Sequence, residues 1–444
     1  MTIQSTPSLH RKRHKSLGVP ELIAIALGGM VGGGIFSVLG ISVSMIGALT
    51  PIAFALGGVM ASFAAYSYVK LAAYFKDEGA TYSFFKRTFP RSTNTASLIG
   101  WWVVFGYIST LALYAYTFSS YLISGFSFAE NEWIRKAIAC GVIGVFSLIN
   151  IWSVKGMGKI EDIMVYTKII LLVVISIVLV KSSHASLPVL FENTDSASIL
   201  NVLIVASLTF VAYEGFQLVI HATNEMDCPE KKIPISIYTA IVLATAVYVI
   251  IALGAILAIP FEEIVLKKEY ALASGAESVL GYWGTNFVIL GALLATSSAI
   301  SATLFGASRL MAVIADDGFF PAFLAKRSHH IPVPAIIVMA GSAAFLILIG
   351  NLRLILEFGS MTFLLVSLLM AYANHRIRHL TNSSKFLTIP SLIGLAAGMA
   401  LIIYFEAITE IEQLMFIATL YVVLSVGSWL FTTISRRGTS ENVN

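Results

Sequence analysis

Charged residues are scarce in this chain: aspartate, glutamate, lysine and arginine make up 12% of its 444 residues, against roughly 25% in soluble domains. Hydrophobic residues make up 57%, and the mean hydropathy is +0.86. So little charge cannot cover the surface of a water-soluble protein of this size. The composition excludes the soluble classes and indicates an integral membrane protein.

Cysteine is almost absent, since only Cys140 and Cys228 occur. A disulfide or a cysteine metal site is therefore not expected. His329 and His330 lie in a basic loop without a third ligand at metal spacing, so we expect no metal and no cofactor. No nucleophile within a span has a histidine or carboxylate partner in a recognisable motif, which argues against a membrane enzyme.

Long stretches lack any acid or base. Residues 22–69, between Glu21 and Lys70, contain no acid or base. This stretch is long enough for two spans of about 20 residues each. Treating charge clusters as loops predicts an all-α integral membrane protein with about 12 transmembrane helices, centred near residues 32, 60, 109, 144, 170, 212, 246, 297, 342, 366, 396 and 423. We expect one transmembrane domain over 17–436, between a basic tail at 1–16 and a polar tail at 437–444.

Lysine and arginine fall mainly on alternate connecting segments. Of the 28, 21 lie in the N-terminal tail or after even-numbered spans, six lie on the opposite side, and Lys168 lies within a span. Cytoplasmic loops hold an excess of these residues, so we expect both termini in the cytoplasm and a multi-pass protein of the plasma membrane, or the inner membrane of a bacterium. The asymmetry also explains the net charge of +4, and nucleic-acid binding is not expected.

Five glycines interrupt the first span between Gly28 and Phe36. A helix can be broken at membrane depth only where protein buries it or where it lines a cavity, and a broken helix frees backbone groups to hold a charged solute. The alternative is that these glycines serve close helix packing.

A second interruption, Phe210–Phe216, lies five spans later. Because five is odd, the second set of five spans enters the membrane from the opposite side. This predicts inverted repeats over about 17–182 and 197–380, with two extra helices over about 387–436. The paired interruptions favour a binding site over packing alone.

Lys168 lies deep in the fifth span, where a lysine costs about 2.5 to 3.5 kcal/mol on insertion scales. A buried lysine can gain and lose a proton when its surroundings change, which makes Lys168 a candidate proton carrier. The alternative is a lysine that extends to the membrane interface.

Other polar residues in the spans have open roles. Glu214, inside the second interruption, is a candidate for contacting a substrate ammonium, carrying a proton or capping freed backbone N–H groups. The hydroxyls of the eighth span either hold a ligand or bond to their own helix; they are Thr296, Ser297, Ser298 and Ser301. The tyrosines of the third span either line a cavity or pack; they are Tyr107, Tyr114 and Tyr116.

Three segments carry a family resemblance: Gly32–Phe36, Glu78–Tyr82, and Phe210–Phe216 followed by Asn224–Pro234. In order and spacing they resemble motifs of amino-acid permeases of the amino acid, polyamine and organocation superfamily. The resemblance covers nearly all of the chain. It implies the LeuT-like 5+5 inverted repeat with broken helices 1 and 6.

The resemblance also implies site residues. The substrate carboxylate would meet the backbone N–H groups of Gly32, Gly33 and Gly34, and the amino group would meet carbonyls. The residues implied on the amino-group side and around the substrate are Met30, Phe210, Val211, Tyr213 and Glu214. Gly33 replaces a usual serine and Val211 replaces a usual gating aromatic, so the substrate side chain stays open.

Lys168 matches the fifth-helix lysine that stands in for a sodium ion in proton-coupled permeases, facing Ser297 and Ser298. We therefore expect a secondary active amino-acid transporter, importing an amino acid with a proton by alternating access. Its partners would be a small-molecule amino acid, with a cationic or amine-bearing one among the candidates, a proton and the lipid bilayer. A proton-independent amino-acid or polyamine exchanger on the same fold is the alternative, and a transport-dead sensor is disfavoured.

Overall fold

The computed structural model describes residues 17–152, 154–181, 198–266, 271–328 and 331–441. The predicted tail 1–16 and the loop residues Lys267, Lys268, His329 and His330 lie outside these ranges. The described residues form helices and no β-strand. The chain is an all-α integral membrane protein.

The elements of the first half are α1 (Val19–Met30), α2 (Gly33–Ile46), η1 (Gly47–Leu49), α3 (Thr50–Phe75), α4 (Ala80–Thr88), α5 (Thr93–Ile123), α6 (Glu132–Trp152) and α7 (Val154–Lys181). Those of the second half are α9 (Ile199–Leu208), η2 (Thr209–Tyr213), η3 (Phe216–Glu225), α10 (Pro229–Ala258), α11 (Phe261–Leu266), α12 (Ala271–Asp316), η4 (Ala322–Ala325), α13 (Val333–Ile349), α14 (Leu352–Arg376), α15 (Lys385–Thr409) and α16 (Ile411–Glu441). Elements labelled η are 3₁₀ helices.

Ten helical stretches among the described residues are long and apolar enough to cross a membrane. One of them, Gly33–Phe75, reverses at Gly47 (φ 53°) and so contains two crossings. The shorter apolar helices α1 and α13 supply the first half of span one and the ninth span. Together these elements account for the twelve predicted spans.

The last and the eighth spans have features that the sequence prediction did not specify. α16 continues to Glu441, so the first residues of the polar tail belong to this helix. α12 bends at Gly281 (φ 64°), so the eighth span is Trp283–Asp316 and the residues before it form a separate helix.

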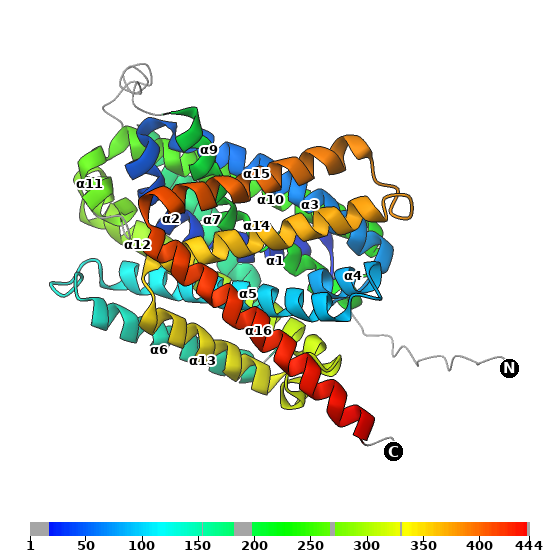
Figure 1. The fold of residues 1–444 in the computed structure, drawn as a ribbon. Helices are drawn as coiled ribbons and strands as arrows, with labels where there is room; N and C mark the ends of the chain where they lie inside the picture. Colours follow the sequence, from blue (N-terminus) through cyan, green and yellow to red (C-terminus); the bar gives the residue numbers. More distant parts are fainter. Residues whose placement is uncertain (1–16, 153, 182–197, 267–270, 329–330, 442–444) are drawn as a thin grey trace.

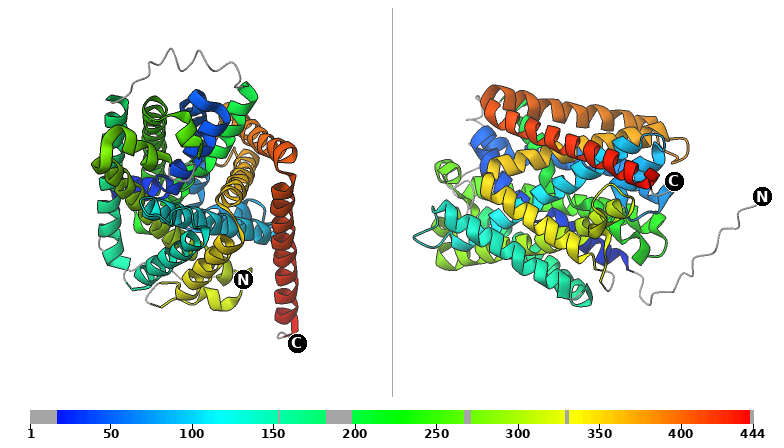
Figure 2. Two further views of the ribbon diagram at one scale, coloured as in Figure 1. Left: turned by 90° about the vertical axis from the view of Figure 1, so that its left-hand side faces the viewer. Right: turned by 60° about the horizontal axis from the view of Figure 1, so that its bottom comes forward.

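The helices form an inner and an outer set. In the most apolar window of α5 78% of residues are buried, and in that of α14 83%, but the values for α15 and α16 are 28% and 17%. Figure 2 shows α15 and α16 on the outside of the bundle. The last two helices are therefore peripheral.

One end of the bundle carries α4 and a group of ion pairs, and we call it the basic face (Figure 1). Arg87–Asp77 is a local pair there, and the other contacts join segments that are distant in the sequence: Lys76–Glu230 (3.1 Å), Lys86–Asp317 (2.7 Å), and Lys232 Nζ to the Leu17 carbonyl (2.8 Å). The segments after spans two, six and eight and the start of span one thus share one face. This matches the alternation of lysine and arginine in the sequence.

Candidate functional site

The first span breaks over two residues. α1 ends at Met30 and α2 starts at Gly33, while Val31 (ψ 72°) and Gly32 (φ −123°, ψ −145°) leave helical geometry. The Gly32 N–H donates to the Met30 carbonyl at 2.8 Å, which closes a sharp turn. The amides of Gly33 and Gly34 open α2, where no preceding helical carbonyl can receive them.

The second break lies in the sixth span, at Glu214 and Gly215. The 3₁₀ helix η2 ends at Tyr213, Glu214 is extended (ψ 132°), and Gly215 has φ 130°, a conformation that a side chain rarely adopts. The predicted interruption at Phe210–Phe216 is therefore present.

The two breaks touch each other. A Cβ built on Gly215 would lie 2.5 Å from the carbonyl carbon of Gly29, and one built on Gly34 would lie 2.8 Å from the Cα of Ala212. Gly29 and Gly34 thus let backbone approach backbone, whereas Gly32 lies in the break itself. A Cβ built on Gly32 would lie 2.5 Å from Ala299 Cβ, so close packing applies at all three positions, and the solute-binding role of the glycines stays a prediction.

Tyr248 of α10 joins the two breaks and was missed by the sequence analysis. Its hydroxyl lies 2.6 Å from the Met30 carbonyl and 2.7 Å from that of Ala212. A hydroxyl has one proton, so two freed carbonyls share one donor. The Tyr114 hydroxyl of α5 also donates a hydrogen bond next to the first break, to the Gly29 carbonyl at 2.9 Å. A tyrosine in an ordinary apolar span gives no sequence signal for such a role.

We expect Tyr248→Phe to slow transport about tenfold, because losing one hydrogen bond to buried carbonyls costs about 1 to 3 kcal/mol. Initial uptake rates in proteoliposomes would measure this. Tyr238→Phe, on the same helix, is the matched control. Equal rates in the two variants would contradict a role for the Tyr248 hydroxyl at the breaks.

Lys168 is fully buried and contacts the first break. Its Nζ lies 3.2 Å from the Gly28 carbonyl, 2.6 Å from that of Val31 and 2.6 Å from Ser298 Oγ. An ammonium group has three protons, one for each of these acceptors. Two of the acceptors are carbonyls at the C-terminal end of α1, where the helix dipole favours a cation. The side chain does not extend to the interface.

The hydroxyl groups of the eighth span differ in their hydrogen-bond partners. Ser298 accepts from Lys168 and also donates to the Ala295 carbonyl at 2.9 Å. Thr296 donates to the Ala292 carbonyl of its own helix at 2.7 Å. Ser297 is half-buried next to Ser298, and Ser301 has a buried hydroxyl without a hydrogen-bond partner in the described structure.

Glu214 is buried in the second break. One of its oxygens accepts from the Gln217 side-chain amide, and the other, Oε1, has no hydrogen-bond partner in the described part of the chain. The Gly215 N–H at the break donates to Gln217 Oε1 at 3.2 Å. Gln217, which the sequence analysis did not select, therefore caps the break. Glu214 Oε1 keeps its capacity to accept a hydrogen bond.

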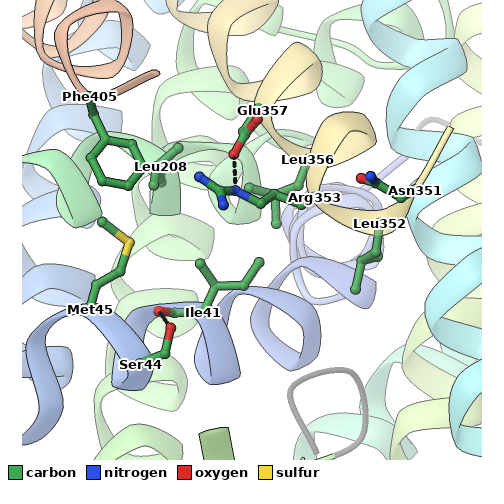
Figure 3. Close-up of a pocket in the computed structure, with 10 residues that line it drawn as sticks. All are labelled: Ile41, Ser44, Met45, Leu208, Asn351, Leu352, Arg353, Leu356, Glu357 and Phe405. Carbon is green, nitrogen blue, oxygen red and sulfur yellow. Dashed lines mark hydrogen bonds and ion pairs between the residues drawn. The ribbon is translucent and has the colours of Figure 1, made fainter. Parts of the chain in front are cut away.

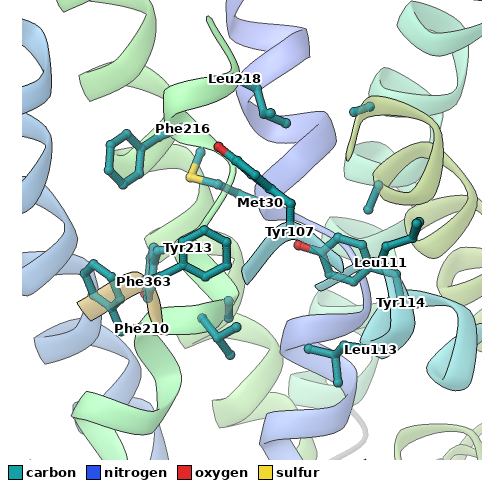
Figure 4. Close-up of a cluster of buried hydrophobic side chains, with 14 of the residues drawn as sticks. Met30, Tyr107, Leu111, Leu113, Tyr114, Phe210, Tyr213, Phe216, Leu218 and Phe363 are labelled. Atoms are coloured by element: carbon teal, nitrogen blue, oxygen red, sulfur yellow. The ribbon is translucent and has the colours of Figure 1, made fainter. Parts of the chain in front are cut away.

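The aromatic side chains around the breaks are packed together (Figure 4). Phe210, Val211 and Tyr213 are each 0% exposed. The Tyr213 hydroxyl donates to the Phe54 carbonyl of α3 at 2.6 Å, and its ring contacts that of Tyr248. Tyr213 thus anchors η2 to α3 rather than leaving its hydroxyl open to a solute.

A cavity of about 260 Å³ lies on the face opposite the basic face, and we call it the α2–α14 cavity. Figure 3 shows its lining, from α2 (Ile41, Ser44, Met45), α9 (Leu208), α14 with Asn351 (Leu352, Arg353, Leu356, Glu357) and α15 (Phe405). Ile41 follows Gly34 by seven residues, about 10 Å along a helix. The cavity therefore ends about two helical turns from the first break.

The chain matches known transporters over nearly its whole length. The model of the amino acid permease family matches residues 17–426. The inner membrane transport protein YbaT of Escherichia coli is 28% identical over 88% of this chain and 89% of its own length. The methylthioribose transporter of Bacillus subtilis is 24% identical over 89% of each chain, and its branched-chain amino acid permease BcaP is 24% identical over 86% of each.

The family fits the geometry, because discontinuous helices that meet inside the bundle are a recurring feature of secondary transporters. The chain belongs to the amino acid permease family and is a membrane transporter, not an enzyme.

Proposed function

We propose that this protein imports an amino acid together with a proton by alternating access. The observation that carries the proposal is Lys168, whose ammonium donates to the Gly28 and Val31 carbonyls and to Ser298. Loss of the proton leaves an amine with two N–H groups for three acceptors. The protonation state of one side chain then changes how the first break is held.

The substrate carboxylate is assigned to the amides at the start of α2, from Gly33 and Gly34, where a helix N-terminus favours an anion. Gly32 joins them when its N–H releases the Met30 carbonyl. The amino group is assigned to carbonyls and acid at the breaks, from Val211 and Glu214. Met30 joins this set only when Tyr248 releases it, since its carbonyl already accepts from Gly32 and Tyr248. The names of the relatives include a branched-chain amino acid permease, which supports an amino acid as the substrate.

Phe210, Val211 and Tyr213 form the wall around this substrate position, and Ser297 and Ser298 complete the proton-coupling site. The repeats of about 17–182 and 197–380 are the units that rock against each other, and the helices over about 387–436 are peripheral. The contacts of the basic face support a state closed on that side. His221 adds to them, because its Nδ1 lies 2.7 Å from the Glu78 carbonyl.

Uptake into proteoliposomes tests the proposal. After a thermal-shift screen of the twenty amino acids and common polyamines has found a ligand, that ligand should accumulate against its gradient when the outside is more acidic. Accumulation that ignores the pH gradient but requires substrate inside would favour the alternative, a proton-independent exchanger.

The orientation is tested at Cys228. This cysteine is exposed and lies just before Pro229, the first residue of α10, on the basic face. We propose that this face is cytoplasmic, with both termini there and the protein in the plasma membrane. A membrane-impermeant maleimide should label Cys228 in inside-out vesicles and not in intact cells, with the Cys228→Ser variant as the control. Labelling of intact cells would reverse the assignment.

A further inference from the structure

Four charged side chains gather on the face opposite the basic face, where α14, α15 and the turn before α16 meet. Arg353 Nε donates to Glu357 Oε1 at 2.6 Å. Arg353 Nη1 lies 3.1 Å from Glu410 Oε1, and Nη2 lies 3.8 Å from Glu406 Oε1. Three carboxyl groups therefore share one guanidinium.

The three carboxyl groups differ in exposure. The side chain of Glu410 is 42% exposed, that of Glu357 is 2% and that of Glu406 is 0%. Water solvates Glu410. A buried carboxylate needs a partner within the protein, because removing its charge from water costs several kcal/mol.

The buried pair lacks hydrogen-bond donors. Glu357 Oε2 and both oxygens of Glu406 have no hydrogen-bond partner among the described residues, and both carboxyl groups face the same guanidinium, Glu357 through Arg353 Nε and Glu406 through Arg353 Nη2. Two carboxylates have acceptors only, so they cannot bond while both are ionised. A proton on either oxygen supplies the missing donor and removes the repulsion between like charges.

Among the described residues of the helices packed around the pair, Arg353 is the one cation recorded against it. Arg353 already serves three carboxyl groups, and the start of α16 adds the negative charge of Glu412 and the amide of Gln413. From the other elements packed on this end, α2 presents the hydroxyl of Ser44, the nearby half of α5 carries tyrosines but no charge, and α9 has no titratable residue.

We propose that Glu357 and Glu406 form a proton-holding carboxyl pair, separate from Lys168, in which one shared proton ties α14 to α15 beside the α2–α14 cavity. Glu357 lines that cavity, so the proton comes from solvent there and returns to it. An O–H bond forms on one carboxylate when the pair is loaded and breaks when the pair is emptied.

Glu357 lies on α14, the helix that contacts the second broken span. Ser360 Oγ of α14 donates to the Leu208 carbonyl at 3.1 Å, and a Cβ built on Gly359 would lie 3.4 Å from Val211 Cγ2. Both residues follow Glu357 within one helical turn. Repulsion between the emptied carboxylates therefore acts on the helix that both lines the cavity and contacts the second broken span.

The test compares the thermal unfolding midpoint of the purified protein with that of Glu406→Gln from about pH 6 to about pH 9. Glutamine keeps the shape and donates permanently to Glu357. As the pH rises, the wild-type pair loses its proton, so the wild-type midpoint should fall by roughly 4 °C relative to Glu406→Gln. Lys168 is present in both proteins, so its contribution cancels in the comparison. Glu410→Gln, which changes the exposed partner of the same arginine, should follow the wild type.

A second measurement does not depend on folding stability. The infrared carbonyl band of a protonated carboxylic acid should be present in the wild type and in Glu410→Gln at neutral pH and should weaken in Glu406→Gln; Glu357→Gln replaces this variant if it does not fold. Identical pH profiles and an unchanged band would overturn the proposal. Neither measurement uses substrate or a gradient, so the result is independent of whether Lys168 couples transport to protons.

Discussion

Replacing Lys168 by alanine should abolish accumulation driven by a pH gradient, reducing uptake to that of protein-free liposomes. The change removes the titrating group and leaves the Gly28 and Val31 carbonyls without a side-chain donor, at about 1 to 3 kcal/mol for each unpaired buried group. Substrate binding should persist, because the carboxylate position at the start of α2 does not include Lys168. Uptake with and without an acidic exterior, together with ligand-induced thermal shifts, measures the two properties separately.

Lys181→Ala is the matched control for this experiment. Lys181 is exposed at the end of the same helix, so its removal changes the charge of α7 without reaching the breaks. Unchanged pH-driven uptake in Lys168→Ala would falsify the role of Lys168 as the proton carrier. The fold and the contact between the breaks would remain.

Replacing Gly215 by alanine should have the largest effect on stability. The new Cβ would lie 2.5 Å from the Gly29 carbonyl carbon and 2.7 Å from the Met30 nitrogen, and both are backbone atoms that no rotamer change can move. Overpacking costs about 1 to 3 kcal/mol, and a side chain at φ 130° adds strain of similar size. We expect the unfolding midpoint to fall by roughly 10 °C and transport to be lost.

Gly141→Ala provides the comparison, because a Cβ at Gly141 in α6 meets nothing within 4 Å. That variant should unfold at the wild-type temperature or slightly above, since alanine favours helix. If Gly215→Ala unfolded together with Gly141→Ala, the close contact between the two breaks would be wrong.

Several elements of the fold were predictable because each is coded locally. Uncharged runs of membrane length marked the spans, and the alternation of lysine and arginine grouped the loops that the basic face brings together. Gly32 and Gly215 marked the breaks, because glycine tolerates the backbone angles found there. The position of Lys168 in an apolar helix was enough to predict partners from other spans.

The identity of the partners could not be predicted in the same way. Tyr248 and Gln217 have no local signal, since a tyrosine or a glutamine in a span is compatible with many environments. Glu357 and Glu406 lie near helix ends, where acids usually face water. In the sequence they cannot be distinguished from the charged residues of loops. Only the packing of α14 on α15 shows that both are buried and adjacent.

By itself the sequence determined that this protein crosses the membrane many times, that its first and sixth spans are interrupted, and that one lysine is buried among apolar residues. These are properties of composition and local backbone preference, which act within a few residues of each other. The tertiary structure alone decided that the breaks touch, that the Lys168 ammonium reaches carbonyls of the first break, and that two buried carboxyl groups meet. Such contacts join residues more than a hundred positions apart or on separate helices, and their distances depend on how whole helices pack.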